Sequence, residues 1–296
     1  MVIGSGIAGL TATKQLLQSR PSLMVVNTEA ELAGGLVVNI QELDGKIQGS
    51  GIDFASDLMT SVMDHGGTML MERVTDLRED KSGWAVVTPE GTHYARAVII
   101  ASGATLKKLN IPGEDEFEHK GVSRCADCDG PLFSGQDVVV VGGGDSALQE
   151  ARILSGYCRQ VIIVNRGAEF SAQQNLIKAI RACDNVTVRH MAEVTAVRGA
   201  NKVEAVQVRD VAKNTMSAIA CGALFGFIGL HPSSEFLPAS VARDSNGFLI
   251  TDAGLNAGNR LFVAGAVRSG NGGMLEHAIA EGTAAADATI KALSEL

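Results

Sequence analysis

The 296-residue chain lacks any block of basic residues: 33 Asp and Glu outnumber 25 Lys and Arg, for a net charge of −8. A nucleic-acid-binding surface needs concentrated basic residues to neutralise phosphates, so the composition argues against such a partner. The longest apolar stretch, Ala218 to Leu230, is interrupted by glycines and is shorter than the roughly 20 residues of a membrane helix. Gly4, Ser5 and Gly6 break the first apolar stretch, which argues against a signal peptide. We therefore expect a cytoplasmic protein without a membrane or nucleic-acid partner.

Cysteine is also scarce, and the five cysteines are an odd number for a secreted disulfide scaffold. Cys125 and Cys128 form a C-x-x-C motif, which in a reducing compartment is catalytic or metal-binding more often than structural. A zinc site would need a second C-x-x-C or a histidine pair at suitable spacing, and the sequence has neither. An inert buried dithiol is the remaining alternative, although the polar neighbours of the pair argue against it. The other cysteines are interpreted as core residues: Cys158, Cys183 and Cys221.

Glycine, in contrast, is concentrated in two similar turns. Gly4-Ser5-Gly6-Ile7-Ala8-Gly9 and Gly142-Gly143-Gly144-Asp145-Ser146-Ala147 each follow an apolar strand pattern and precede a helical one. In a dinucleotide-binding βαβ unit, the first glycine makes the turn and the second lets the backbone approach a pyrophosphate. The third small residue lets the helix pack on the strand. A second strand follows each turn, Leu23–Val26 and Val161–Val164.

These repeats predict an α/β fold with two Rossmann-like three-layer nucleotide-binding domains, the second inserted into the first. Turn-rich segments at Ile111–Asp115 and Gly229–Ser234 mark the expected hinges. The predicted domains are 1–111 with 235–296, and 112–234. Further patterns predict a hairpin of Trp84–Thr88 with Thr92–Ala95, a buried strand at Ala97–Ala101 and a β-rich piece at Val194–Val208.

Taken together, these segments resemble low-molecular-weight thioredoxin reductase, of the pyridine-nucleotide disulfide oxidoreductase superfamily. The matching motifs run from Gly4 to about Gly282. They are Gly4–Gly9, Gly34-Gly35, Ile99–Ala104, Ile111–Glu114, Cys125–Gly130, Gly142–Ala147, Phe225–Gly229 and Ala264–Arg268.

The resemblance implies FAD in the first domain, NAD(P)H in the second, a homodimer, and a thioredoxin or thioredoxin-like protein as partner. It also implies a rotation between domains that presents the flavin alternately to the nicotinamide and to the dithiol. Cys128 would face the flavin, Cys125 would exchange with the substrate disulfide, and Asp129 would protonate a leaving thiolate. A helix cap is the alternative role for Asp129.

Cofactor-binding residues also carry over by resemblance. Those expected to contact FAD are Gly4, Gly6, Ile7, Ala8, Gly9, Asn27, Gly34, Gly35, Ser102, Gly103, Gly265, Ala266, Met274 and Leu275. Those expected to contact the nicotinamide nucleotide are Gly142, Gly144, Asp145, Ser146, Ala147, Asn165 and Arg166.

The sequence departs from the family pattern at three places. Of the family's arginine cluster for a 2′-phosphate, Asn165–Ser171 keeps only Arg166. This loss favours NADH or relaxed use of both coenzymes, with Asn165 as a candidate partner of the ribose 2′-hydroxyl. Ala266 replaces an aspartate that bonds the flavin's ribityl chain. Gly273-Met274 replaces an Arg-Gln pair near the flavin ring, where the start of the last helix offers either a backbone contact or a plain turn.

Two other functions remain open at this stage. A flavin dithiol oxidase would run the same dithiol backwards, and the reduced arginine cluster is consistent with it. A non-enzymatic redox sensor would bind a partner without turnover. His277, on the predicted last helix, is assigned a structural role rather than a catalytic one.

Overall fold

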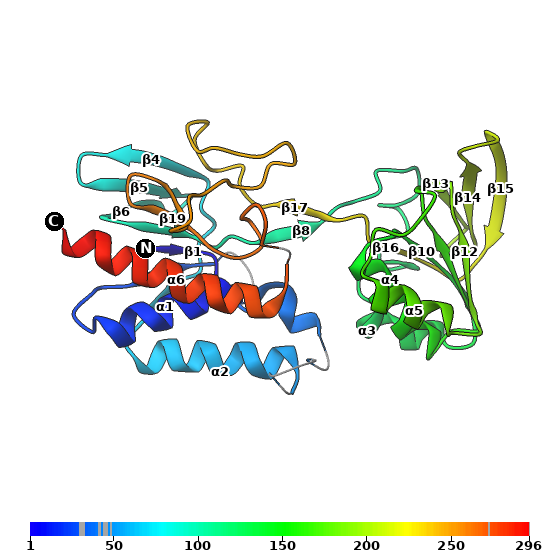
Figure 1. The fold of residues 1–296 in the computed structure, drawn as a ribbon, viewed down its shortest axis with the longest axis horizontal. Helices are drawn as coiled ribbons and strands as arrows, with labels where there is room; N and C mark the ends of the chain where they lie inside the picture. Colours follow the sequence, from blue (N-terminus) through cyan, green and yellow to red (C-terminus); the bar gives the residue numbers. More distant parts are fainter. Residues whose placement is uncertain (30–32, 41–42, 44–46, 48, 272, 296) are drawn as a thin grey trace. The chain divides into compact units, whose positions relative to one another are not determined.

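The computed structural model describes every residue except 30–32, 41–42, 44–46, 48, 272 and 296. The chain forms two compact units, residues 1–105 with 231–296 and residues 106–230 (Figure 1). The chain passes between the units twice, at strands β8 (Ala104–Leu106) and β17 (Leu230–Pro232), which pair with each other.

The predicted boundaries after residues 111 and 234 were therefore too late. Leu109 and Ile111 pack on a core cluster of the second unit. The buried Glu114 carboxylate accepts hydrogen bonds from the backbone N–H groups of Leu109 (3.0 Å) and Asn110 (2.6 Å). This turn belongs inside the second unit because its backbone donors find their acceptor there. At the other boundary, the Ser233 N–H donates to the Gly103 carbonyl in the first unit.

The first unit is built on a six-stranded sheet of order β18-β19-β7-β1-β2-β3. Its pairs are parallel except β18 with β19. The strands are β1 (Val2–Ile3), β2 (Val26–Thr28), β3 (Thr68–Leu70), β7 (Val98–Ile100), β18 (Asn256–Gly258) and β19 (Leu261–Val263). The predicted strand at 97–101 is confirmed, while the one predicted at 23–26 lies two to three residues later. Because β1 has only two residues, its partner β2 pairs through Asn27 and Thr28.

Helices cover one face of this sheet, and a small antiparallel sheet covers the other. The helices are α1 (Ile7–Ser19), η1 (Gly35–Asn39), α2 (Gly51–Asp64) and α6 (Leu275–Ser294). The small sheet comprises β4 (Asp76–Asp80), β5 (Gly83–Thr88) and β6 (Gly91–Ala95), so the predicted hairpin is confirmed and gains a third strand. Trp84 and Leu77 of this sheet are fully buried against Ile100 of β7.

The second unit repeats the plan with a five-stranded parallel sheet of order β12-β11-β10-β16-β9. Its strands are β9 (Val122–Ser123), β10 (Asp137–Val141), β11 (Gln160–Val164), β12 (Val186–Arg189) and β16 (Ala223–Gly226). In β10, Val138 and Val140 face one core cluster while Val139 and Val141 face another, which explains why the whole strand is apolar.

The two faces of this second sheet are covered differently. Helices α3 (Ala126–Asp129), α4 (Asp145–Ser155) and α5 (Gln174–Arg181), with the short turn η2 (Gly130–Phe133), lie on one face. The antiparallel strands β13 (Ala192–Arg198), β14 (Ala205–Asp210) and β15 (Thr215–Ala220) cover the other. The α/β prediction with a second, inserted three-layer unit is confirmed, as is the β-rich piece near 194–208.

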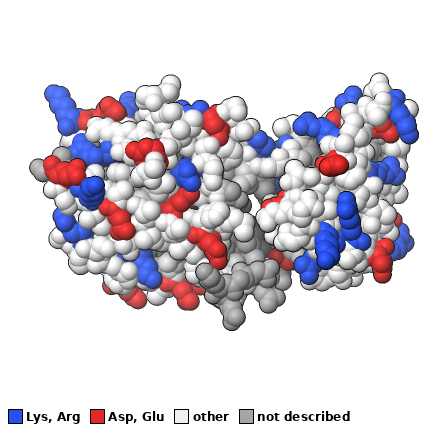
Figure 2. All heavy atoms as spheres, viewed as in Figure 1, with Lys and Arg blue, Asp and Glu red and all other residues white. Residues whose placement is uncertain are grey.

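No helix in the described part of the chain is both long and apolar enough to cross a membrane. On the face drawn in Figure 2, acidic and basic side chains are interspersed over the first unit rather than gathered into a basic patch.

Candidate active site

A pocket of about 850 Å³ opens in the first unit at the carboxyl ends of β1, β2 and β7. The carboxyl edge of a parallel sheet is where ligands of such folds bind. Most of the predicted flavin contacts line this pocket: Gly4, Gly6, Ile7, Ala8, Gly34, Gly35, Ser102, Gly103, Gly265, Ala266, Met274 and Leu275.

The glycines of the first turn have separate structural roles. Gly4 has φ +103°, and a Cβ there would lie 2.3 Å from the Ala101 carbonyl oxygen. A Cβ on Gly9 would lie 1.9 Å from the Gly4 carbonyl oxygen, so Gly9 allows helix and strand to pack and does not line the pocket. Gly6, which precedes α1, is different because a Cβ there would meet no atom within 4 Å. The open space beside Gly6 is part of the pocket and lies next to the N–H groups at the start of α1.

Asn27 is a corrected prediction, because its side chain is fully buried and does not line the pocket. Its Oδ1 accepts from the Ser5 hydroxyl at 2.8 Å, and its Nδ2 donates to Thr13 Oγ1 at 3.0 Å. Asn27 therefore stabilises the glycine turn from the protein interior. Glu29 lines the pocket instead, and its Oε2 accepts from the Ser5 N–H at 2.9 Å. An acidic residue about 20 positions after a glycine turn is the Rossmann signal that sequence reasoning missed here.

The second glycine turn has the same construction. Gly142 has φ +142°, and a Cβ there would lie 2.2 Å from the Phe227 carbonyl oxygen. Gly144 precedes α4, and a Cβ on it would have only the Ser171 hydroxyl nearby, at 3.8 Å. Ala147 is fully buried, as the third small position of the motif requires. Ser146 is exposed at the start of the helix.

The dithiol lies on the same unit, where Cys125 and Cys128 form a disulfide. Cys125 precedes α3, and its Sγ accepts from the Cys128 N–H at 3.2 Å. The Ser123 hydroxyl accepts from the Cys125 N–H at 3.1 Å. Cys128 is exposed and Cys125 half-buried. Asp129 ends α3 and makes no side-chain cap hydrogen bond at η2, so the alternative of a helix cap is wrong.

A family model described as pyridine nucleotide-disulphide oxidoreductase matches residues 1–282. The chain belongs to that family. Thioredoxin reductase from Treponema pallidum (strain Nichols) is 32% identical over the whole chain and 97% of that protein.

Solved structures agree with this assignment. The crystal structure of thioredoxin reductase from Lactococcus lactis has a TM-score of 0.92 at 28% identity, covering all of this chain and 98% of that one. The enzyme from T. acidophilum has a TM-score of 0.89 at 27% identity, covering 98% and 96%. The chain is therefore a disulfide oxidoreductase of the thioredoxin reductase type.

The segment before the last helix forms part of the pocket wall. Ala266 offers no polar side-chain atom to the pocket, whereas Asn271, which the sequence did not single out, lies almost fully buried in the wall. His277 Nδ1 lies 2.6 Å from the Asn271 carbonyl oxygen, which supports a structural role for this histidine. Nearby, Glu281 pairs with Arg268 and accepts from the Gly265 N–H at 2.9 Å. Burial opposes the charge on Glu281, but these contacts outweigh it and lower its pKa.

The loop after β11 contradicts the role predicted for Asn165. That side chain is buried, and its Nδ2 donates to the carbonyls of Glu169 (2.8 Å) and Gly167 (3.2 Å). Its Oδ1 accepts from the Gly167 N–H at 3.3 Å. Asn165 thus holds the loop together instead of facing a ribose. Arg166 is exposed, whereas the Asp145 carboxylate is engaged by the backbone and side chain of Gln173.

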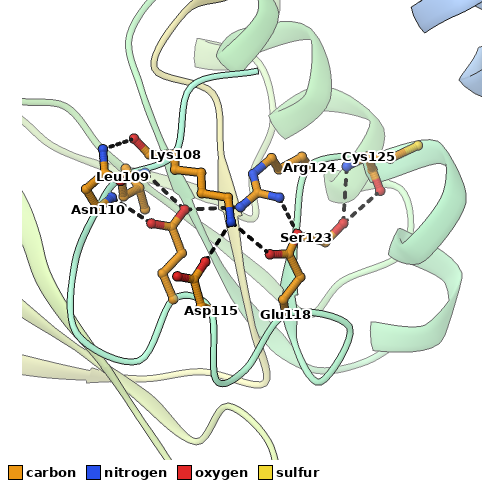
Figure 3. Close-up of polar contacts among 9 residues, drawn as sticks. Lys108, Leu109, Asn110, Asp115, Glu118, Ser123, Arg124 and Cys125 are labelled. Atoms are coloured by element: carbon orange, nitrogen blue, oxygen red, sulfur yellow. Dashed lines mark hydrogen bonds and ion pairs between the residues drawn. The ribbon is translucent and has the colours of Figure 1, made fainter. Parts of the chain in front are cut away.

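A charged network holds the segment that leads into the dithiol (Figure 3). Arg124 pairs with Glu118 and, at 3.3 Å, with the buried Glu114. Lys108 joins it through Glu118 at 3.6 Å and also pairs with Asp115 at 2.7 Å. The Arg124 hydrogen bond lowers the pKa of Glu118. Arg124, the residue before Cys125, is therefore held by two ion pairs, which orients the start of α3.

The other thiols differ in environment from the dithiol. Burial raises the pKa of Cys158 to about 11 and that of Cys221 to about 12, so neither is reactive near neutral pH. The prediction that these two are core residues is confirmed, while Cys183 is half-buried and donates to the Ala179 carbonyl. In the described residues, no group of three or more His, Cys, Asp and Glu side chains is placed to hold a metal ion.

Proposed function

We propose that this chain is an FAD-dependent disulfide reductase that passes electrons from NAD(P)H to the Cys125–Cys128 disulfide and on to a thioredoxin-like protein. The observation that carries the proposal is the disulfide beside a glycine turn, both on the second unit and joined by α4. The relatives named thioredoxin reductase support the choice of partner. By resemblance to the family, we also propose a homodimer in the cytoplasm.

The pocket of the first unit fits the dinucleotide and ring system of FAD. Gly6 leaves open space beside the helix N–H groups, where a pyrophosphate would lie. Gly34-Gly35, Ser102-Gly103 and Gly265-Ala266 supply backbone along the walls, with Met274 and Leu275 beside them. When bound, FAD supplies a carrier that accepts two electrons from the nicotinamide and delivers them to the disulfide.

The dithiol residues then divide the exchange between them. With the S–S bond opened by two electrons, the Cys125 thiolate attacks the partner's disulfide and expels one of its sulfurs as a thiolate. Asp129, half-buried and adjacent to Cys128 in the sequence, is the proposed proton donor to a leaving thiolate. Cys128 then attacks Cys125 in the mixed disulfide, which releases the partner as a dithiol and restores the Cys125–Cys128 bond.

The nicotinamide donor is proposed to be NADH, or either coenzyme with little preference. Arg166 is the one cation in the loop 165–173, which also carries Glu169. A single guanidinium beside a carboxylate gives a 2′-phosphate little net attraction. Since Asn165 is engaged by its own loop, this preference rests on the missing cations rather than on a new ribose contact.

Restoring the cations should change coenzyme choice. In the double variant Gly167→Arg with Ser171→Arg, we expect the ratio of kcat/KM for NADPH over NADH to rise by about tenfold or more, because two guanidinium groups would face the 2′-phosphate. The measurement is steady-state kinetics with each coenzyme. The double variant Gly167→Gln with Ser171→Gln, which adds long uncharged side chains at the same positions, controls for side-chain bulk. An unchanged ratio in the arginine variant would reject this interpretation of the loop.

Blocking the second glycine turn should separate the two nucleotides. In Gly144→Val, the new Cβ would meet only the Ser171 hydroxyl, in ordinary contact at 3.8 Å, so the protein should still fold. The added methyl groups would occupy the space proposed for the nucleotide, so we expect FAD to stay bound while NADH reduces it at least about 100-fold more slowly. Anaerobic stopped-flow absorbance at the flavin's visible maximum measures this rate. Wild-type reduction in the variant would show that the nicotinamide nucleotide binds elsewhere.

Stopped-flow spectroscopy of the wild type tests the proposed function itself. NADH should bleach the flavin within seconds, and oxidised thioredoxin should then restore it. Because only Arg166 remains of the arginine cluster, a flavin dithiol oxidase is the second candidate. A flavin reduced only by small dithiols would favour that oxidase, and a flavin that responds to neither donor would favour a redox sensor.

A further inference from the structure

Helix α4 connects the second glycine turn to the dithiol through one partly buried hydrogen bond. Glu150 lies on α4, six positions after Gly144, and its Oε2 accepts from the backbone N–H of Ala126 at 2.8 Å. Ala126 is fully buried and is the first residue of α3, directly after Cys125. The same helix supports the end of the redox turn, since a Cβ on Gly130 would lie 3.2 Å from Leu154 Cδ2. Neither the motifs nor the family pattern singled out Glu150.

The surroundings of Glu150 contain little that would neutralise it. Burial raises its pKa, the Ala126 N–H opposes that effect, and the negative charge of Asp127 adds to it. In the described part of the chain, no Lys or Arg forms an ion pair with this carboxyl group.

Charged groups on the neighbouring elements are engaged elsewhere or exposed. On α4 itself, Asp145 is bonded to Gln173 and Arg152 is exposed. On α5, Lys178 and Arg181 are exposed in the last turn. On β10, Asp137 pairs with Arg159, which precedes β11. On α3, Asp129 follows Cys128, and Asp127 is the charge that acts on Glu150.

We propose that Glu150 is a positioning residue for disulfide exchange, which fixes the first amide of the redox turn and restrains ionisation of the Cys125 thiol. The proposal rests on the proposed function, because Glu150 can influence the Cys125 thiol only after the disulfide has been reduced. When two electrons break the S–S bond, each sulfur takes one of them and keeps one electron of the former bond, so both become thiolates to which protons from solvent can bind. The Glu150 carboxylate binds the amide of Ala126, the residue after Cys125, and its negative charge disfavours a thiolate nearby. Cys125 should therefore keep its proton to higher pH than it would without this carboxylate.

Two substitutions separate the hydrogen bond from the charge. Glu150→Gln keeps an oxygen that accepts from Ala126 but removes the negative charge, whereas Glu150→Ala removes both. Glu193→Gln serves as the control, because Glu193 lies on β13 and pairs with Arg209. Each protein is reduced with dithiothreitol and desalted. Iodoacetamide alkylation of Cys125 is then followed against pH by mass spectrometry, which separates this site from Cys128.

We expect the Glu150→Gln profile to move to lower pH, so that Cys125 alkylation below its midpoint is about threefold faster, a shift of roughly half a pKa unit. Wild type and Glu193→Gln should coincide. In Glu150→Ala the Ala126 amide loses its acceptor, and we expect exchange of the reduced dithiol with oxidised thioredoxin to be about tenfold slower than in Glu150→Gln.

A Glu150→Gln profile that overlays the wild type would overturn the restraint on Cys125. Equal exchange rates in the Gln and Ala variants would overturn the positioning role. If Glu150→Ala fails to fold, Glu150→Met, which preserves bulk without an acceptor, replaces it. The alkylation needs neither nicotinamide nor flavin, so its result is separate from the proposed function. A flavin that NADH fails to reduce would count against that function and leave this readout intact.

Discussion

Cys125→Ser is expected to abolish reduction of a protein disulfide while leaving reduction of the flavin by nicotinamide intact. Serine keeps the shape of the turn, but its oxygen cannot form the S–S bond that Cys125 makes with Cys128. Removing a nucleophile of this kind should lower turnover with oxidised thioredoxin by about 1,000-fold or more. Two assays on one preparation measure the effect: steady-state thioredoxin reduction, and single-turnover bleaching of the flavin.

Cys183→Ser is the matched control for this variant. Cys183 is a half-buried free thiol outside the C-x-x-C motif, and it should leave both assays unchanged. Full turnover in Cys125→Ser would mean that another group carries out the exchange, and the role given to this residue would have to be withdrawn.

Gly6→Val is expected to give a folded protein that cannot bind FAD. The backbone of Gly6 has φ −67°, which valine can adopt, and a Cβ there would contact no protein atom within 4 Å. The added methyl groups would instead occupy the space assigned to the cofactor. We expect FAD affinity to fall by about 100-fold or more, equivalent to roughly 2.7 kcal/mol. Flavin fluorescence titration of the cofactor-free protein measures the affinity, and circular dichroism confirms the fold.

Gly254→Ala provides the comparison within the same unit, because Gly254 does not line the pocket and its added Cβ would lie 3.3 Å from the Asp252 Oδ1. It should bind FAD like the wild type. If Gly6→Val retained normal affinity, the pocket of the first unit would not be the place where the flavin's pyrophosphate binds.

Local sequence patterns were sufficient to predict the elements that form the fold. The two glycine turns predict two nucleotide-binding units because each glycine position has a steric requirement, which Gly4 and Gly142 meet with φ above +100°. The all-valine strand at 138–141 predicts burial on both faces, and its residues are divided between two core clusters. The C-x-x-C motif predicts a disulfide, which Cys125 and Cys128 form.

The contacts of individual side chains were harder to predict, because they depend on partners that are distant in the sequence. Asn27 and Asn165 follow their turns at equal spacing, yet Asn27 supports Gly4 and Thr13, and Asn165 holds its own loop. The role of Glu29 could be predicted only from the true position of β2. That position is determined by the register of β2 with the two-residue strand β1. The contact of Glu150 depends on the packing of α4 against α3, and no short sequence motif predicts that packing.

In the proposed reaction, electrons from a nicotinamide open the Cys125–Cys128 bond through a flavin held in the first unit. The most direct test is anaerobic addition of one equivalent of NADH to the FAD-loaded protein, followed by iodoacetamide and mass spectrometry. We predict that the flavin absorbance recovers as the disulfide opens, and that Cys125 and Cys128 both carry the label. Label missing from both sulfurs after NADH has been consumed would show that the nicotinamide's electrons do not reach this disulfide.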